Sequence, residues 1–307
     1  MADVILDTPA APAPVKPNAV LRGLLHNPAV LFGGTVIAIV LLMALLAPWL
    51  GTIDPTRINP IARNKVPGAE FFFRTDTGER IKMVAWFGTD GLGRDVYSRV
   101  VYGARVSLLV GVSVALISIV CGLFIGVLAG FFRILDAIIM RIMDGLMAIP
   151  AILLAIAMVS LFRSSVWTVI IAITVPQVPG VVRLVRSIVL SVREEPYVEA
   201  AVTLGTSTPK LLWRHVLPNT IAPMIVQGTF ICASAILIEA ILSFLGIGVP
   251  PEVPTWGNIM AEGRQVFSLF PHNIIYPGVF LAMTILAVNI LGDGLRDTLD
   301  PKMAKRV

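Results

Sequence analysis

Charged residues are scarce in this sequence of 307 amino acids. Only 14% of its residues are Asp, Glu, Lys or Arg, whereas a soluble domain carries about a quarter. Apolar residues make up 56% of the chain, and the mean hydropathy is +0.86. This shortage of charge argues against a soluble globular domain and is typical of a protein that crosses a lipid bilayer.

Cysteine and histidine are too few for a disulfide framework or a metal centre. The two cysteines, Cys121 and Cys232, both fall in uncharged stretches, so we expect them to be small packing residues. The three histidines lie far apart and show no spacing typical of metal ligands. The sequence therefore predicts no metal site.

Motifs that hold phosphate or activate a nucleophile are also missing. None of the six lysines directly follows a glycine, which excludes the G-x-x-x-x-G-K-[ST] loop that cradles nucleotide phosphates. Neither Gly-x-Ser-x-Gly nor His-Glu-x-x-His occurs. The net charge of +5 comes without a basic patch interleaved with aromatic residues. We therefore expect no catalytic residue, no cofactor bound by this chain and no nucleic-acid partner.

Long uncharged runs are what the sequence has instead. A helix needs about 20 residues to cross a bilayer, and six runs reach or approach that length: 23–53, 106–132, 145–162, 164–182, 216–238 and 273–292. Only Arg163 separates the third run from the fourth, which predicts a tight helical hairpin. In the fourth run, Pro176 and Pro179 predict a broken helix. The predicted fold is an all-α integral membrane protein with six transmembrane helices.

The distribution of Lys and Arg predicts the orientation. With the N-terminus in the cytoplasm, the inner segments hold 13 of these residues. The outer segments hold 2 once residues 51–105 are set aside, because so long a loop is translocated largely regardless of its charge. This bias predicts that both termini are cytoplasmic.

The boundaries of the runs divide the chain into segments. The apolar core of the first run is too long for a cleavable signal peptide, so we expect an anchor. In the loop that follows, Phe71-Phe72-Phe73 lies beside a turn at Asp76-Thr77-Gly78, which favours a small hairpin. The expected segments are a cytoplasmic tail (1–28), a first transmembrane helix (29–50), an extracytoplasmic loop (51–104), a transmembrane core (105–297) and a cytoplasmic tail (298–307).

One polar segment, residues 194–219, interrupts the apolar chain on the predicted cytoplasmic side. Pro196 suits a first helical position, and Gly205 can end that helix in the left-handed conformation. Thr208 is the expected N-cap of a second short helix, which Pro218 is expected to end. The pattern predicts two short surface helices joined by a glycine elbow. They are either a simple connection between two spans or a docking knob for a soluble partner.

The residues of this segment resemble those of a known family. Glu199-Ala200-Ala201, Gly205 and Leu217-Pro218 are similar in spacing to the EAA loop of ABC importer permeases. His215 stands where that family has a branched apolar residue. Further stretches resemble the C-type permease of dipeptide and oligopeptide importers: Gly88-Thr89-Asp90-Gly91-Leu92-Gly93-Arg94-Asp95, Leu242-Ser243-Phe244-Leu245-Gly246 and Asn289-Ile290-Leu291-Gly292-Asp293-Gly294.

This resemblance, which covers residues 23 to about 301, implies a type I permease core and a set of partners. The partners are a homologous permease subunit, two cytoplasmic ATPase subunits that bind ATP and Mg²⁺, an extracytoplasmic binding protein and the inner membrane of a bacterium or archaeon. The implied cargo is a peptide; nickel, glutathione and other small solutes are alternatives within the branch. The residues expected to couple to the ATPases are Glu199, Ala200, Ala201, Gly205, Thr208, Lys210, Trp213, Arg214, Leu217 and Pro218.

Several residues inside the predicted spans invite either a structural or a functional interpretation. The four-residue repeat of Gly122, Gly126 and Gly130 favours close helix packing. An i, i+3 ion pair is expected between Arg141 and Asp144. Four residues are candidates for the translocation path or its gate, with a kink or a structural hydrogen bond as the alternative: Gln177, Pro179, Gln227 and Glu239.

Two other classes of function remain open at this stage. A self-sufficient secondary transporter or channel would favour inverted repeats and paired charges within the spans, but Glu239 is the single strong candidate of that kind and no convincing repeat occurs. A structural scaffold without a transport role is disfavoured by the predicted break in the fourth span.

Overall fold

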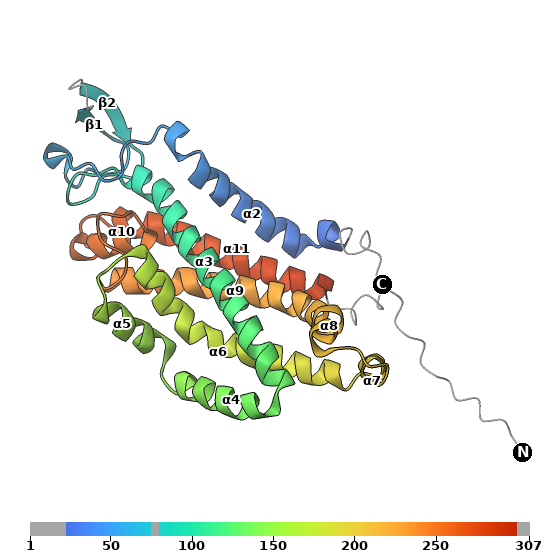
Figure 1. Cartoon of the computed structure of the whole chain (residues 1–307). Coiled ribbons are helices and arrows are strands. Elements are labelled where there is room, and N and C mark those ends of the chain that lie inside the picture. Colours follow the sequence, from blue (N-terminus) through green and yellow to red (C-terminus); the bar gives the residue numbers. More distant parts are fainter. Residues whose placement is uncertain (1–22, 75–79, 300–307) are drawn as a thin grey trace, which may run out of the picture.

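The computed structural model describes residues 23–74 and 80–299 of the chain and consists mainly of long helices (Figure 1). Within the described residues, five helices are long and apolar enough to cross a membrane. These are α2 (Pro28–Leu45), α3 (Val96–Phe131), α6 (Val166–Arg193), α9 (Leu217–Phe244) and α11 (His272–Leu299). Five of the six uncharged runs thus lie in bilayer-length helices, as predicted.

The candidate for a sixth span is a bent pair of helices. Helix α4 (Arg133–Met147) and helix α5 (Ala151–Leu161) pass the test for a span only as a pair, and their axes differ by 88°. The break precedes Pro150, in keeping with the rule that the residue before a proline avoids the helical region. The expectation that the run 145–162 forms one helix is therefore wrong, because the end of α4 and the whole of α5 share it.

Helix α6 is unbroken, and the predicted break in the fourth span is also wrong. Pro176 and Pro179 both lie inside a helix that runs from Val166 to Arg193. Its buried side, which includes Pro179 and several valines, packs against neighbouring helices. Because such packing supports a membrane helix where a proline removes a backbone hydrogen bond, the two prolines do not end it.

The glycine repeat of α3 faces a valine repeat on α6. A Cβ atom built on Gly126 would lie 2.6 Å from Val185 Cβ, which is closer than real side chains approach. The same spacing of one helical turn gives three such contacts: Gly122 with Val181, Gly126 with Val185, and Gly130 with Val189. The two helices therefore approach closely along this stripe, as small-xxx-small faces allow.

The loop after α2 contains the predicted hairpin. Strands β1 (Ala69–Arg74) and β2 (Arg80–Ala85) pair antiparallel, with Phe71 opposite Met83. Phe71 and Phe73 are buried in a small apolar cluster with Ala62, whereas Phe72 on the opposite face is exposed. The predicted turn at residues 76–78 lies outside the described residues.

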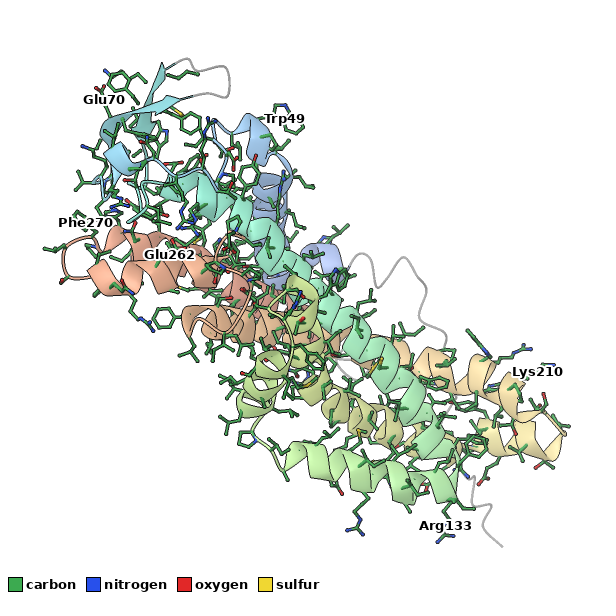
Figure 2. All side chains as sticks on the ribbon, turned by 60° about the vertical axis from the view of Figure 1, so that its left-hand side comes forward. Trp49, Glu70, Arg133, Lys210, Glu262 and Phe270 are labelled. Carbon is green, nitrogen blue, oxygen red and sulfur yellow. The ribbon has the colours of Figure 1, made fainter. Side chains whose placement is uncertain are left out.

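The two ends of the helical bundle differ in character. The β-hairpin and α10 (Trp256–Gly263) lie at one end, and the short helices α7 (Pro196–Thr203) and α8 (Thr208–Leu211) lie at the other (Figure 1). In Figure 2 Glu70 and Phe270 mark the hairpin end, and Lys210 marks the opposite, elbow end. The start of α2 and the close of α11 meet at this elbow end, where the Asn27 side-chain amide donates to the Gly294 carbonyl at 3.2 Å.

Candidate functional site

The elbow segment, residues 194–219, turns on a left-handed glycine. Gly205 has φ +78°, and its N–H donates to the Val202 carbonyl at 2.9 Å. The next N–H, of Thr206, donates to the Ala201 carbonyl at 3.0 Å. These two bonds form a Schellman motif, in which a residue with positive φ closes the end of a helix and satisfies its last carbonyls. The predicted glycine stop after α7 is therefore present.

Gly205 is needed for its backbone conformation, because nothing crowds it within the chain. A Cβ atom added there would meet no heavy atom within 4 Å. Leu204 beside it is 86% exposed, and Val202 is exposed as well.

The second part of the segment differs from prediction in two ways. Ser207, rather than Thr208, occupies the N-cap position of α8. Pro218 does not end the helix: the chain runs from α8 through a π-helical turn (Leu212–Val216) into α9. The wider turn accommodates the proline ring, and the Leu217 N–H donates five residues back, to Leu212. Residues Thr208 to Phe244 thus form one helical rod of 37 residues.

Three buried apolar residues anchor the elbow segment to the bundle. Val198 of α7, Leu211 of α8 and Val216 of the π-helical turn are each at most 3% exposed and belong to the main core cluster. The outward side carries most of the candidate coupling residues, because the following are all exposed: Glu199, Ala200, Gly205, Thr208, Lys210, Trp213, Arg214 and Pro218. Ala201 and Leu217 are half-buried.

The elbow segment is also held by polar residues that sequence reasoning missed. The Asn219 side-chain amide donates to the His215 carbonyl at 2.6 Å and to the Tyr197 hydroxyl at 3.2 Å. It thereby links α7 to the start of α9. Arg193 donates to the carbonyls of Gly130 and Phe131 at 3.1 Å each, which links the close of α6 to that of α3. The signal for Asn219 was its place directly after the Leu-Pro pair, but its partners depend on the tertiary fold.

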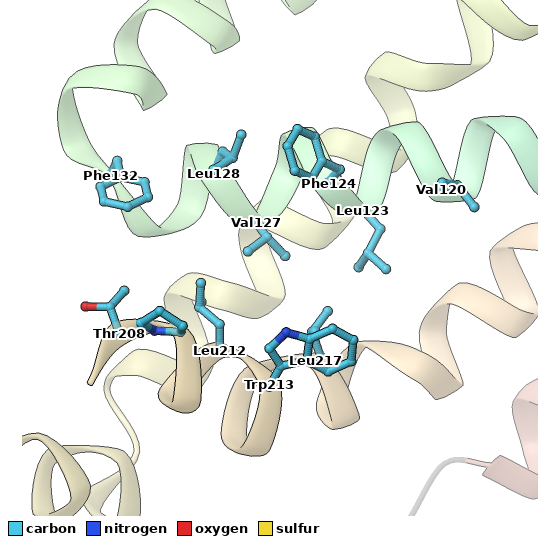
Figure 3. Close-up of a pocket in the computed structure, with 11 residues that line it drawn as sticks. Val120, Leu123, Phe124, Val127, Leu128, Phe132, Thr208, Leu212, Trp213 and Leu217 are labelled. Carbon is cyan, nitrogen blue, oxygen red and sulfur yellow. The ribbon is translucent and has the colours of Figure 1, made fainter. Parts of the chain in front are cut away.

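An apolar groove separates the elbow segment from α3 (Figure 3). It has a volume of about 760 Å³. Trp213 and Leu217 stand on one wall, opposite Val127 and Phe124 of α3. With Thr208, three of the candidate coupling residues line this groove. None of Gln177, Pro179, Gln227 and Glu239 lines it.

Ion pairs fasten α4 to α6 near the same end. Arg186 Nη2 lies 2.7 Å from Asp136 Oδ2, and Arg183 Nη2 lies 2.5 Å from Asp144 Oδ1. The expected pair of Asp144 with Arg141 is therefore wrong. Arg141 and Asp144 both lie on α4, but Arg183 approaches Asp144 from the adjacent helix α6. The spacing of residues along one helix does not indicate such contacts between helices.

The candidate path residues occupy packed positions. Gln177 of α6 is half-buried and donates to the Ser234 hydroxyl of α9 at 3.3 Å. Pro179 is buried and Gln227 is half-buried. Glu239 is fully buried and accepts a hydrogen bond from Ser243 at 2.8 Å. Gln177 thus joins α6 to α9, and Glu239 lies within the packed hairpin end of α9.

A cluster of four charged residues closes the hairpin end. Arg99 of α3 lies 2.7 Å from Asp90 and also pairs with Glu262 of α10. Arg94 pairs with the same two carboxylates. The Asp90 and Arg side chains are at most 5% exposed, whereas Glu262 is 26% exposed.

Beside the cluster, burial raises the pKa of the Asp95 carboxyl, although Ser98 donates two hydrogen bonds to it. The stretch 88–95 thus ties the loop, α3 and α10 together.

Comparison with known proteins identifies the family. The profile of the family described as "binding-protein-dependent transport system inner membrane component" matches residues 118–305. A second profile, "N-terminal TM domain of oligopeptide transport permease C", matches residues 19–67.

Individual relatives are similar over nearly their whole lengths. The "probable peptide ABC transporter permease protein y4tQ" of Sinorhizobium fredii is 50% identical over 95% of both chains. The "dipeptide transport system permease protein DppC" of Alkalihalophilus pseudofirmus is 40% identical, over 92% of this chain and 88% of its own. The "glutathione transport system permease protein GsiD" of Salmonella paratyphi A is 41% identical, over 90% and 86%. The chain therefore belongs to the family of inner membrane components of binding-protein-dependent transport systems, as a permease of the ABC type.

Proposed function

We propose that this chain is one of two permease subunits of an ATP-driven importer and that its elbow segment receives the movement of the ATPase subunits. The partners are a homologous permease, two cytoplasmic ATPases that bind ATP and Mg²⁺, and an extracytoplasmic binding protein. In this assignment the elbow end and both termini face the cytoplasm, and the β-hairpin faces the outside. The single observation that carries the proposal is the rigid, exposed elbow: a Schellman-capped turn at Gly205 fixed to the bundle by buried side chains.

The energetics explain why such a segment is needed. Moving a two-state transporter from 1:99 to 99:1 in favour of one state takes about 5.5 kcal/mol of differential interaction. The membrane helices have no energy source of their own, so a partner that binds nucleotide supplies it. The transfer requires a stiff connection, and the rod from Thr208 to Phe244 provides one because it begins within the elbow segment.

We further propose that the cargo is a peptide. The relatives named for peptide and dipeptide transport support this choice. The relative named for glutathione transport is similar at a comparable level, and glutathione is itself a small peptide. Nickel and other small solutes are the alternative cargo for the same machinery.

The test is a pair of substitutions in the assembled transporter. Gly205→Asp forces a side chain into the positive-φ position, and Lys210→Ala shortens an exposed basic side chain of α8. In cells that carry the complete transporter, we expect the double variant to insert normally and to lose uptake of radiolabelled trialanine. A matched control is Gly145→Ala on α4, where an added Cβ atom meets nothing within 4 Å. Undiminished uptake in the double variant refutes the proposed role of the elbow. Ion-gradient-driven flux through this chain reconstituted alone would support a secondary transporter instead.

A further inference from the structure

Glu239 is a carboxylic acid sealed inside the hairpin end of the membrane bundle. Its side chain is fully buried in α9. The Ser243 hydroxyl donates to Oε1 at 2.8 Å, and the Ser107 hydroxyl of α3 approaches Oε2 at 3.4 Å. The hydroxyl of Thr255, which directly precedes α10, lies beside the same carboxyl group. Three hydroxyl groups from three parts of the chain thus meet at one carboxyl group.

The surroundings of Glu239 differ from those of a substrate or ion path. Within residues 23–74 and 80–299, no Lys, Arg or His forms an ion pair with it. A buried carboxyl group that pairs with no cation is tolerated only when hydrogen bonds satisfy its oxygens. The hydroxyl groups satisfy the carboxyl oxygens. Because they come from α9, α3 and the residue before α10, they show which parts of the chain meet at the carboxyl group.

The chain that follows α9 is folded tightly onto this point. The Ser243 hydroxyl, besides donating to Glu239, accepts the Val249 N–H at 3.2 Å. Thr255 is the N-cap of α10, and its hydroxyl accepts the Asn258 N–H at 3.1 Å. Asn258 in turn donates to three carbonyls of the connecting segment, those of Val249, Pro250 and Val253. Residues 246–258 are therefore one folded unit, and its bond to Ser243 connects it to Glu239.

Glu239 also lies near the far end of the helical rod that begins in the elbow segment. The rod spans residues Thr208 to Phe244, a length of about 55 Å at 1.5 Å per residue. In Figure 1 α9 runs from α8 at the elbow end toward α10 at the hairpin end. A displacement of the rod at the elbow therefore also moves the carboxyl group of Glu239. Through Ser243 this group is connected to the folded unit of residues 246–258, which includes the start of α10.

Helix α10 is bound on its other side to α3. The Trp256 indole N–H donates to the Val100 carbonyl at 3.1 Å, and Glu262 pairs with Arg99. Helix α10 thus contacts both α3 and the rod. Its Gly257 packs directly against Ala240 and Ser243 of the rod, next to the buried carboxyl group of Glu239.

We propose that Glu239 is a positioning residue that transmits the movement of the rod to α10 and so opens and closes the hairpin end of the pathway. The carboxyl group acts as a hydrogen-bonding joint and does not contact the cargo. This inference rests on the proposed function, since it assigns the last step of the movement that enters at the elbow. It excludes a role for Glu239 as a charge that lines the path.

The test compares Glu239→Ala and Glu239→Gln in the complete transporter reconstituted in proteoliposomes. ATP hydrolysis and uptake of radiolabelled trialanine are measured on the same preparation. The alanine variant lacks the carboxyl group that bonds to the hydroxyl groups, so we expect ATP hydrolysis to continue while the uptake per ATP falls about tenfold. The glutamine side chain still bonds to the hydroxyl groups, and we expect its uptake per ATP within about twofold of the wild type. Thr284→Ala is the matched control, because this buried hydroxyl bonds only within its own helix.

A second measurement reports the joint without transport. Hydrogen exchange of the amides in residues 246–256 should become faster in Glu239→Ala and remain unchanged in Glu239→Gln and in the control. The proposal is overturned if the alanine variant keeps its uptake per ATP, if hydrolysis and uptake fall in proportion, or if glutamine is as damaging as alanine. A wild-type complex that neither hydrolyses ATP nor takes up peptide refutes the proposed function itself, and the joint with it.

Discussion

Replacement of Gly205 by alanine separates a requirement for backbone conformation from a requirement for space. Gly205 has φ +78°, and an added Cβ atom would meet no atom within 4 Å. The whole cost in this chain is therefore that of a left-handed backbone with a side chain, about 1 kcal/mol. That cost favours opening of the Schellman turn by about fivefold.

The assay is hydrogen exchange of the purified transporter, read at the amides that close α7. The N–H groups of Gly205 and Thr206 donate to Val202 and Ala201, so their exchange reports the turn directly. We expect about fivefold faster exchange in Gly205→Ala and a smaller increase in Gly205→Asn, because asparagine tolerates the left-handed region better than alanine. Equal exchange in the alanine variant and the wild type, or a larger effect of asparagine than of alanine, would refute the reasoning from backbone strain.

Three further substitutions test other parts of the structure. Gly126→Leu pushes a side chain into α6, so we expect the free energy of unfolding to fall by about 1–3 kcal/mol or more; an unchanged melting temperature would contradict the close α3–α6 contact. Arg99→Ala leaves Arg94 alone to neutralise the carboxylates of Asp90 and Glu262, so we expect the free energy of unfolding to fall by about 3 kcal/mol, the lower end for a broken buried ion pair; a loss below about 1 kcal/mol would speak against the buried charge cluster. Asn219→Ala frees α7 from α9; we expect peptide uptake to fall several-fold with normal insertion, and full uptake would show that this link is dispensable.

The uncharged runs predicted the helices because the bilayer imposes one requirement on every span. About 20 apolar residues are needed whatever the neighbours are, so α3 and α11 were visible in composition alone. Gly205 was equally visible, since a glycine after an amphipathic stretch is a local signal for a left-handed helix stop. The hairpin of β1 and β2 followed from aromatic residues beside a turn.

Prolines were the main source of error, because their effect depends on their surroundings. Pro176 and Pro179 lie in a helix that is held by neighbouring helices, and Pro218 follows a π-helical turn that makes room for its ring. Pro150 marks the true break, between α4 and α5. The sequence contains all four residues, but the packing and the turn type that decide among them arise only in the fold.

Long-range polar contacts were likewise beyond sequence reasoning. Asp144 pairs with Arg183, which is distant in sequence, rather than with Arg141 one turn away. Glu239 stood out as an ionisable residue in an apolar run, but its hydroxyl partners come from α3 and from the residue before α10. Periodicity describes one element at a time and cannot report which elements meet.

Leu204 offers the most direct measurement of the central claim, that the elbow faces the cytoplasm and contacts an ATPase. This side chain is 86% exposed at the elbow, and Leu204→Cys can be studied in a chain whose Cys121 and Cys232 are replaced by alanine. We predict that a membrane-impermeant maleimide labels the new thiol in inside-out vesicles but not in intact spheroplasts, and that a short thiol cross-linker joins it to the ATPase subunit in the assembled transporter. Labelling from the outside, or a complete transporter in which no cross-link to the ATPase forms, would contradict the account.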